Sequence, residues 1–269
     1  MRGRVEGRVV VVTGGASDIG AAIARGLAAE GAAVAVADLD EEAARKVAAE
    51  VTDDGGRALP VQMDVADRAS VADGVRATAA EFGRLDVMFN NAGFNETMRF
   101  LDITEQNFRR IMEVNALGVL IGTQEAARQF LAQGAGDDPD AGGSVRGKVV
   151  NTASIAGRTG FADFAPYSAS KAAVISLTQA AARALAPRGI TVNGFAPGVV
   201  ATPLWTKLDA DLERIGAGDT GFDSMSSSIL LGRPAQPEDL VPTALFLASS
   251  DSDYITGQII PIEGGMVLV

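Results

Sequence analysis

Short apolar runs rich in β-branched residues alternate with longer Ala-rich segments along the whole chain. In the first cycle, residues 8–13 have the composition of a strand and end at Gly14 and Gly15, and apolar residues at helical spacing then continue to Glu30. A repeated strand and helix returns the chain to the same edge of a sheet each time, which makes the strands parallel. We therefore expect an α/β fold with helices on both faces of a parallel sheet.

The alternation predicts a seven-stranded sheet and a single domain. The expected strands are residues 8–13, 33–38, 58–63, 85–89, 148–152, 190–195 and 258–262. Helical spacing covers residues up to 30, then 41–51, 70–82, 105–116, 119–131, 168–186 and 238–248. Because no linker interrupts this series, residues 1–269 are expected to form one doubly wound, Rossmann-type domain.

Two stretches depart from the alternation. The Gly- and Asp-rich residues 133–147 are interpreted as a surface loop without an assigned function. Residues 202–230 mix Gly, Ser and Asp with apolar side chains and include the only Trp. That composition predicts a small mobile lid over a substrate.

Composition excludes several classes of function. Acidic residues outnumber basic ones, 34 to 23, and the net charge of -11 argues against nucleic acid as a partner. The absence of Cys and His removes thiolate metal sites, the commonest metal ligand and the commonest general base. No apolar stretch is long enough for a membrane span or a signal sequence. We expect a cytoplasmic protein that binds a small molecule, and no metal, nucleic acid or membrane.

The first strand-to-helix turn, residues 13–20, reads Thr-Gly-Gly-Ala-Ser-Asp-Ile-Gly. Free backbone N–H groups and the helix dipole at such a turn attract a pyrophosphate, although a glycine-rich turn of this kind can also bind nothing.

Asp38 ends the second strand, where its carboxylate can accept hydrogen bonds from ribose hydroxyls and would repel a 2'-phosphate. Since Ser17 and Leu39 offer no cation, NAD is favoured over NADP; the alternative role for Asp38 is a helix cap.

Further candidates follow the third and fourth strands, at the strand ends where open sheets bind ligands. They are Asp64, Val65, Asn91, Ala92 and Gly93.

Tyr167 and Lys171 lie four residues apart at the start of a predicted helix, so both project from one face. With 2 Tyr and 4 Lys in the chain, chance rarely produces this pair. A phenol with a pKa of about 10 is a poor base at pH 7, but a neighbouring ammonium stabilises the phenolate. The pair predicts an oxidoreductase in which hydride moves between a substrate carbon and a nicotinamide while Tyr167 transfers the proton.

The segments Tyr-Ser-Ala-Ser-Lys at 167–171, Thr-Gly-Gly-Ala-Ser-Asp-Ile-Gly at 13–20 and Asn-Asn-Ala-Gly at 90–93 resemble those of the short-chain dehydrogenases/reductases. The resemblance covers nearly the whole chain. It implies a catalytic tetrad in which Ser154 holds the substrate oxygen and Asn115 anchors a relay water beside Lys171. It also implies a homotetramer that assembles through helices 105–131 and 168–186.

The resemblance further implies that the cofactor is held by the glycine turn, by the strand ends and by the segment after the sixth strand. The expected cofactor residues are Gly14, Ser17, Asp18, Ile19, Gly20, Asp38, Leu39, Asp64, Val65, Asn91, Ala92, Gly93, Tyr167, Lys171, Pro197, Gly198, Val200 and Thr202. Segments such as residues 196–205 and 253–258 look similar to meso-2,3-butanediol (acetoin) and sorbitol dehydrogenases. A small diol, hydroxyketone or polyol is therefore the expected substrate, with Asn95, Ser154, Phe161, Asp163 and Trp205 as candidate contacts.

Asp18 departs from the family's pattern, which usually has Gly at this position. A carboxylate within about 5 Å of a pyrophosphate is unfavourable, so we expect Asp18 to turn to solvent or to cap the helix.

Two other functions remain open: a carbonyl reductase using NADPH, such as a 3-oxoacyl thioester reductase, and a non-catalytic NAD-binding sensor.

Overall fold

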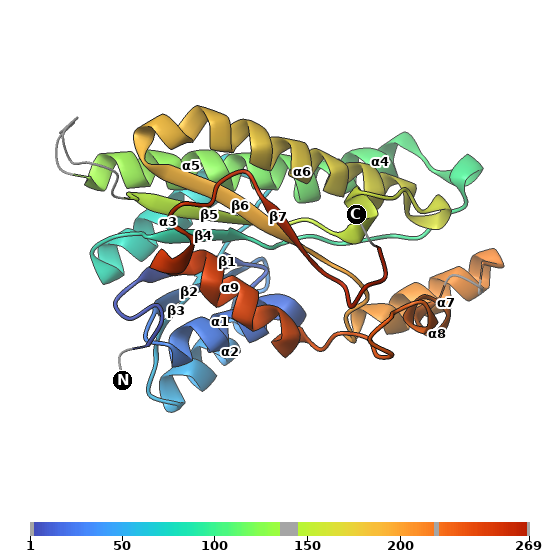
Figure 1. Cartoon of the computed structure of the whole chain (residues 1–269), viewed down its shortest axis with the longest axis horizontal. Coiled ribbons are helices and arrows are strands. Elements are labelled where there is room, and N and C mark those ends of the chain that lie inside the picture. The colour runs from blue at the N-terminus through green and yellow to red at the C-terminus, as the bar shows by residue number, and fades with distance from the viewer. Residues whose placement is uncertain (1–2, 135–144, 218–220, 268–269) are drawn as a thin grey trace.

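A parallel sheet of seven strands forms the centre of the computed structural model, which describes residues 3–134, 145–217 and 221–267 (Figure 1). The strands are β1 (Val9–Thr13), β2 (Ala33–Asp38), β3 (Arg57–Gln62), β4 (Val87–Asn90), β5 (Gly147–Thr152), β6 (Ile190–Pro197) and β7 (Ile259–Ile262). Their order across the sheet is β3-β2-β1-β4-β5-β6-β7, and every adjacent pair is parallel. The predicted fold class is confirmed.

Helices pack on both faces of the sheet. The helices of the described residues are α1 (Asp18–Ala29), α2 (Glu41–Asp53), α3 (Arg68–Phe82), α4 (Glu105–Met112), α5 (Gly118–Gln133), α6 (Ala165–Leu185), α7 (Leu204–Ile215), α8 (Phe222–Ser227) and α9 (Val241–Ala248). Of these, α7 and α8 lie beside the sheet and not on its faces (Figure 1). In Figure 1, α5 and α6 lie above the sheet and α1, α2 and α9 lie below it.

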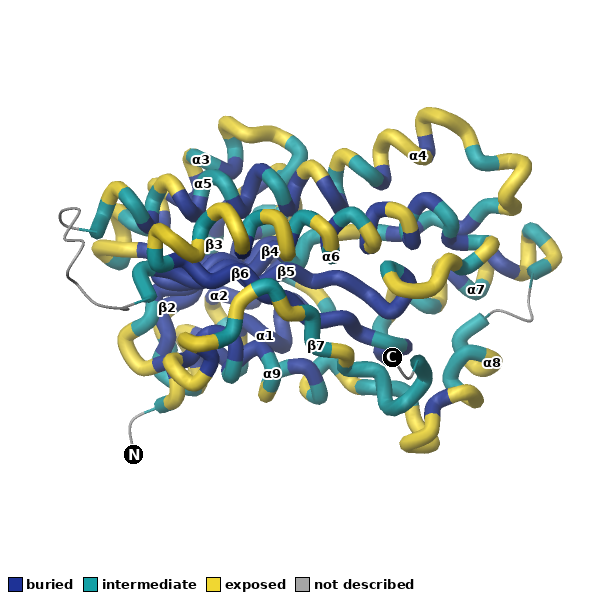
Figure 2. The backbone as a smooth tube through the Cα atoms, turned by 45° about the horizontal axis from the view of Figure 1, so that its top comes forward, coloured by how far each residue is buried: buried dark blue, intermediate teal, exposed yellow. Residues whose placement is uncertain are grey.

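The central strands have both faces covered, which explains their uninterrupted apolar sequence. β1 is buried along its whole length. The neighbouring strands β4, β5 and β6 are buried as well, as their dark blue colour in Figure 2 shows. Val10 and Val12 belong to the core on the α1, α2 and α9 side, whereas Val11 belongs to the core that includes Val75 of α3 and Phe130 of α5. Successive side chains of a strand point to opposite faces, so one run of valines supplies both cores.

Two expected elements differ in detail. The helical pattern at 105–131 forms α4, then a π-helical turn at Glu113–Leu117, then α5. The segment expected as a lid contains two helices, α7 and α8, with Leu208 and Leu212 of α7 buried. Of the expected surface loop, residues 135–144 lie outside the described residues, and α5 and β5 take the positions that flank them.

The strand order reverses between β1 and β4, where β1 has β2 on one side and β4 on the other. Open α/β sheets bind ligands beyond the carboxyl ends of strands at such a point. Within the described part of the chain, none of the helices combines the length and the apolarity that a membrane span requires.

Candidate active site

The turn between β1 and α1 can be built only with glycine at its narrowest points. Gly14 has a φ of +61°, and a Cβ there would lie 2.9 Å from the Cα of Ala92. A Cβ on Gly20 would lie 1.9 Å from the carbonyl oxygen of Gly14. Any side chain at either position would force the turn away from the end of β4, so these glycines fix a backbone surface.

The start of α1 suits an anion. Its N-cap residue, Ser17, makes no side-chain capping hydrogen bond. The first N–H groups of a helix lack partners within the helix, and the macrodipole adds partial positive charge there. The N–H groups near Asp18 and Ile19 can therefore donate to a phosphate group.

Side chains at the end of β4 hold the glycine turn in place. The hydroxyl oxygen of Thr13 accepts hydrogen bonds from the N–H groups of Asn91 (3.0 Å) and Ala92 (3.1 Å). The Asn91 amide donates in return to the Thr13 carbonyl oxygen at 3.1 Å. These bonds bring two motifs that are far apart in the sequence to the same sheet edge.

Asp38 lies against the same turn. Its Oδ2 accepts a hydrogen bond from the Ala16 N–H at 3.1 Å, and its Oδ1 accepts one from the Asp40 N–H at 3.2 Å. Asp40, not Asp38, caps α2, because its side chain accepts from the Ala43 N–H. The alternative interpretation of Asp38 as the helix cap is therefore wrong, and its contact with an adenosine ribose stays a prediction.

The residues after β3 lie near this edge with different exposure. Asp64 is exposed and its Oδ1 accepts from the Ala66 N–H at 2.9 Å. Val65 lies against Gly118 at the start of α5, where a Cβ would approach its Cγ2 to 2.9 Å. Their contact with a cofactor stays a prediction.

Asp18 has a φ of +48° and is the one non-glycine residue with positive φ in the described ranges. This left-handed conformation is the one that glycine adopts without steric cost, which accounts for the Gly that the family pattern has here. Burial raises the pKa of its carboxyl group. None of the described residues donates a hydrogen bond to that carboxylate, so the structure does not support the expected capping role; the side chain is part-exposed.

Tyr167 and Lys171 meet on one face of α6 as predicted. The Lys171 Nζ lies 5.6 Å from the centroid of the Tyr167 ring and donates a hydrogen bond to the Thr152 carbonyl oxygen at 2.8 Å. Lys171 is 3% exposed, and burial lowers its pKa to about 8. The ammonium therefore stays largely protonated at pH 7.

The protein groups alone do not lower the pKa of Tyr167. Burial raises the pKa of its phenol, and the Ser154 hydroxyl opposes that rise by hydrogen bonding. The lowering expected from the neighbouring Lys171 ammonium is therefore not seen in the protein alone. Because burial outweighs the Ser154 hydrogen bond, a lowered pKa of the phenol would have to come from a bound, positively charged nicotinamide.

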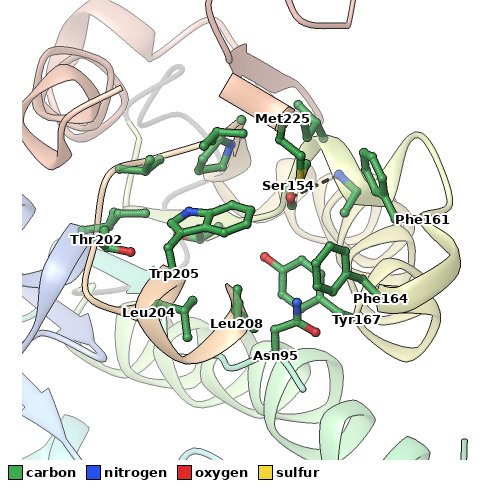
Figure 3. A pocket seen from close by; sticks show the side chains of 18 of the residues that line it. Asn95, Ser154, Phe161, Phe164, Tyr167, Thr202, Leu204, Trp205, Leu208 and Met225 are labelled. Atoms are coloured by element: carbon green, nitrogen blue, oxygen red, sulfur yellow. Dashed lines mark hydrogen bonds between the residues drawn. The ribbon is translucent and has the colours of Figure 1, made fainter. Parts of the chain in front are cut away.

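Ser154 follows β5, lines the same cavity as Tyr167 and is the N-cap of a short 3₁₀ turn, Ile155–Gly157. Its Oγ accepts a hydrogen bond from the Ala156 N–H at 3.1 Å (Figure 3). This bond occupies an acceptor position and leaves the hydroxyl hydrogen available to an oxygen in the cavity.

Asn115 is fully buried in the π-helical turn. Its Oδ1 accepts from the Phe94 N–H at 3.0 Å, and its Nδ2 donates to the Phe94 carbonyl oxygen at 2.9 Å and to the Ser170 Oγ at 3.1 Å. A Cβ on Gly93 would lie 3.1 Å from the Asn115 Oδ1 and 3.5 Å from the Lys171 Nζ. Asn115 and Lys171 are thus close together, as the family resemblance implied.

One cavity of about 140 Å³ collects the catalytic side chains and the segment after β6 (Figure 3). Its lining includes Asn95, Ser154, Tyr167, Pro197, Gly198, Val200 and Thr202, and the aromatic and aliphatic side chains Phe161, Phe164, Leu204, Trp205, Leu208 and Met225. Of the expected substrate contacts, Asp163 is missing from this lining; its carbonyl oxygen accepts from the Met98 N–H at 3.2 Å. A substrate role for Asp163 stays a prediction.

Sequence reasoning missed Phe164, Leu208 and Met225 as cavity residues. Leu208 packs with Leu212 and Phe164 in a small core that also contacts Tyr167 and Trp205. The helical spacing of Leu204, Leu208 and Leu212 could have revealed this apolar face.

Comparisons with known proteins agree with this geometry. The family model described as "Enoyl-(Acyl carrier protein) reductase" matches residues 14–267. The L-2,3-butanediol dehydrogenase of Corynebacterium glutamicum is 42% identical over 264 residues, which cover 97% of this chain and 98% of the relative. The diacetyl reductase [(S)-acetoin forming] of Staphylococcus aureus (strain N315) is 44% identical over 261 residues, covering 96% and 97%.

Solved structures give the same result. The structure of NAD+-bound xylitol dehydrogenase has a TM-score of 0.88 and 31% identity, and the match covers 97% of this chain and all of the other. A short-chain type dehydrogenase/reductase from Mycobacterium marinum has a TM-score of 0.86 and 35% identity, covering 98% and 97%.

Proposed function

Because the chain belongs to the short-chain dehydrogenase/reductase family, as its sequence motifs predicted, we propose that it transfers hydride between NAD(H) and a small secondary alcohol or ketone. The substrate class that we propose is a vicinal diol or a hydroxyketone. One observation carries the proposal: Tyr167, Ser154 and the segment from Pro197 to Thr202 line a single cavity beside buried Lys171.

The chain's own residues divide the proton chemistry. Ser154 donates a hydrogen bond to the substrate oxygen, and Tyr167 accepts the hydroxyl proton during oxidation or returns it during reduction. The buried Lys171 ammonium stabilises negative charge that develops on the phenol, and Asn115 keeps the loop after β4 packed against α6. A bound nicotinamide supplies the hydride acceptor or donor.

The position of Asp38 supports NAD over NADP. Its carboxylate, fixed by the N–H groups of Ala16 and Asp40, would face the ribose and repel a 2'-phosphate. The binding of NAD+ by the xylitol dehydrogenase of similar structure is consistent with this choice. Initial rates with NADH and NADPH test it, and a clear preference for NADPH would refute the assignment.

The walls of the cavity support a small diol over a polyol. Phe161, Phe164 and Met225 offer apolar surface, which suits methyl groups better than a row of hydroxyls. The names of two relatives give 2,3-butanediol, and diacetyl that is reduced to acetoin, and these are small molecules with methyl groups of this kind.

The reaction is tested by the formation of NADH, measured by absorbance, from 2,3-butanediol, xylitol and 2-butanol at alkaline pH. We expect 2,3-butanediol to give the highest kcat/KM. Turnover of a 3-oxoacyl thioester in preference to acetoin would favour the reductase alternative. Absence of turnover with every alcohol and ketone, together with intact NAD binding, would favour the sensor alternative.

We also propose a cytoplasmic homotetramer. Support comes from apolar side chains that remain exposed beside α4, namely Phe100, Leu101, Phe108 and Leu117. Sedimentation equilibrium measures the mass directly, and a monomer at micromolar concentration would refute the assembly.

A further inference from the structure

Asn95 presents an unpaired amide to the active-site cavity. The residue follows β4, is only 7% exposed and lines the cavity together with Ser154 and Tyr167. Its Oδ1 is buried without a hydrogen-bond partner among the described residues. Since nitrogen and oxygen of an amide are assigned from their partners, the relevant fact is that this amide has no partner of either kind in the described structure.

Leaving a buried amide unpaired destabilises the protein, because no hydrogen bond offsets the loss of its contacts with water. Other polar side chains around the cavity do not share this condition. Thr152, for example, donates from its Oγ1 to the Asn91 Oδ1 at 3.1 Å. Asn95 therefore carries a penalty that a ligand in the cavity can remove.

The backbone on both sides of Asn95 is held, so the amide is preorganised. The Phe94 N–H donates to the Asn115 side-chain oxygen, and the Asn115 side-chain nitrogen donates to the Phe94 carbonyl oxygen. The Glu96 carboxylate accepts from the Asn107 Nδ2 at 2.6 Å and from the Arg110 guanidinium at 3.2 Å. These contacts hold the loop that carries Asn95 in place, with the Asn95 side chain buried at the cavity.

The amide also lies in the right place for a second oxygen of the substrate. Figure 3 shows Asn95 next to Tyr167 at the edge of the cavity. Ser154 and Tyr167 are committed to the reacting oxygen, and most of the other side chains in the lining are apolar, among them Phe161 and Leu208. An oxygen on the adjacent carbon needs a polar partner that those apolar side chains do not provide.

We infer that the Asn95 amide binds the non-reacting oxygen of a vicinal diol or hydroxyketone and thereby selects these substrates over simple secondary alcohols. The inference rests on the proposed function. An amide both donates and accepts hydrogen bonds, so one residue serves a neighbouring hydroxyl as well as a neighbouring carbonyl. The same residue would therefore serve a diol and a hydroxyketone in one site.

The test compares kcat/KM for 2,3-butanediol and for 2-butanol, which differ by the second hydroxyl. In the Asn95→Leu variant, which nearly keeps the side-chain volume, we expect kcat/KM for the diol to fall by about 10- to 100-fold. The value for 2-butanol should change less than threefold. Thr97→Val is the matched control, because the Thr97 Oγ1 is also buried without a partner but does not line the cavity.

Each result decides the matter. Equal losses for both alcohols in Asn95→Leu, or an unchanged ratio of the two kcat/KM values, would overturn the inference. If Asn95→Leu fails to fold, as judged by its melting temperature and NAD binding, Asn95→Ala provides the same ratio. If the wild-type enzyme oxidises 2-butanol and the diol with equal kcat/KM, the inference is overturned but the proposed function stands. If it oxidises neither alcohol, the proposed function is overturned.

Discussion

At the active-site edge of the sheet, the cofactor side is formed mainly by backbone groups and the substrate side mainly by side chains. On the cofactor side, backbone groups of the β1–α1 turn and its glycines shape the surface, and Asp38 adds one carboxylate. On the substrate side, the surface consists of side chains from α6, α7, α8 and the loop after β4.

The difference has a physical reason. A pyrophosphate presents the same oxygens in every enzyme of this kind, so N–H groups at a helix start suffice. Substrates differ in shape and in polar groups, and only side chains can vary accordingly. Specificity should therefore respond to single substitutions on the substrate side, whereas cofactor binding should depend on Asp38 and on backbone conformation.

The largest expected effect separates chemistry from cofactor binding. Tyr167→Phe removes the proton donor and acceptor, and we expect kcat to fall by at least about 10³-fold. The Kd for NAD, measured by fluorescence titration, should change less than threefold because the glycine turn is untouched. Turnover close to that of the wild type would disprove the role of Tyr167.

Without a bound cofactor, the buried ammonium of Lys171 should lower the free energy of unfolding at neutral pH. Its pKa is about 8 in the folded chain and 10.5 when unperturbed, so protonation favours unfolding below about pH 8 and this cost is lost as the pH rises toward 10.5. Relative to Lys171→Met, the wild-type free energy of unfolding should improve by about 3 kcal/mol between pH 7 and pH 10.5.

Urea unfolding at several pH values measures this difference. Lys148, whose pKa is also lowered by burial, is present in both proteins and cancels from the comparison. A difference between the two proteins that does not change with pH would show that burial does not perturb Lys171.

Asp38→Ala should weaken NAD binding by about 10- to 100-fold, because charge-assisted hydrogen bonds to the ribose are lost. NADP binding should weaken less or improve, since the repulsion of the 2'-phosphate is removed. Equal losses for both cofactors, measured by titration, would mean that Asp38 only supports the turn through Ala16.

The smallest effect is expected at Asp18. The backbone of Asp18 has a φ of +48°, which is strained for a residue with a side chain. Asp18→Gly removes both this strain and the negative charge. We expect NAD binding to strengthen by less than tenfold, which is about 1.4 kcal/mol. Asp18→Asn is the matched variant that removes only the charge; a gain above tenfold in either would show that the carboxylate strongly opposes the pyrophosphate.

The sequence by itself determined the fold and the chemistry. Alternating patterns and the valines of β1 fixed a parallel sheet, because apolar periodicity is a local property of the chain. The spacing of Tyr167 and Lys171 is equally local, since residues four apart share one face of a helix. Asp38 could be identified as a candidate cofactor residue for the same reason, because its place at the end of a strand is also a local property.

Tertiary structure alone decided the rest. The unusual backbone of Asp18, the capping of α2 by Asp40 and the inclusion of Leu208 in the cavity each depend on how distant segments pack. The isolation of the Asn95 amide is the clearest case, because a missing partner is visible only when every neighbour has been placed. Burial and hydrogen bonding are properties of the packed molecule, and no local pattern contains them.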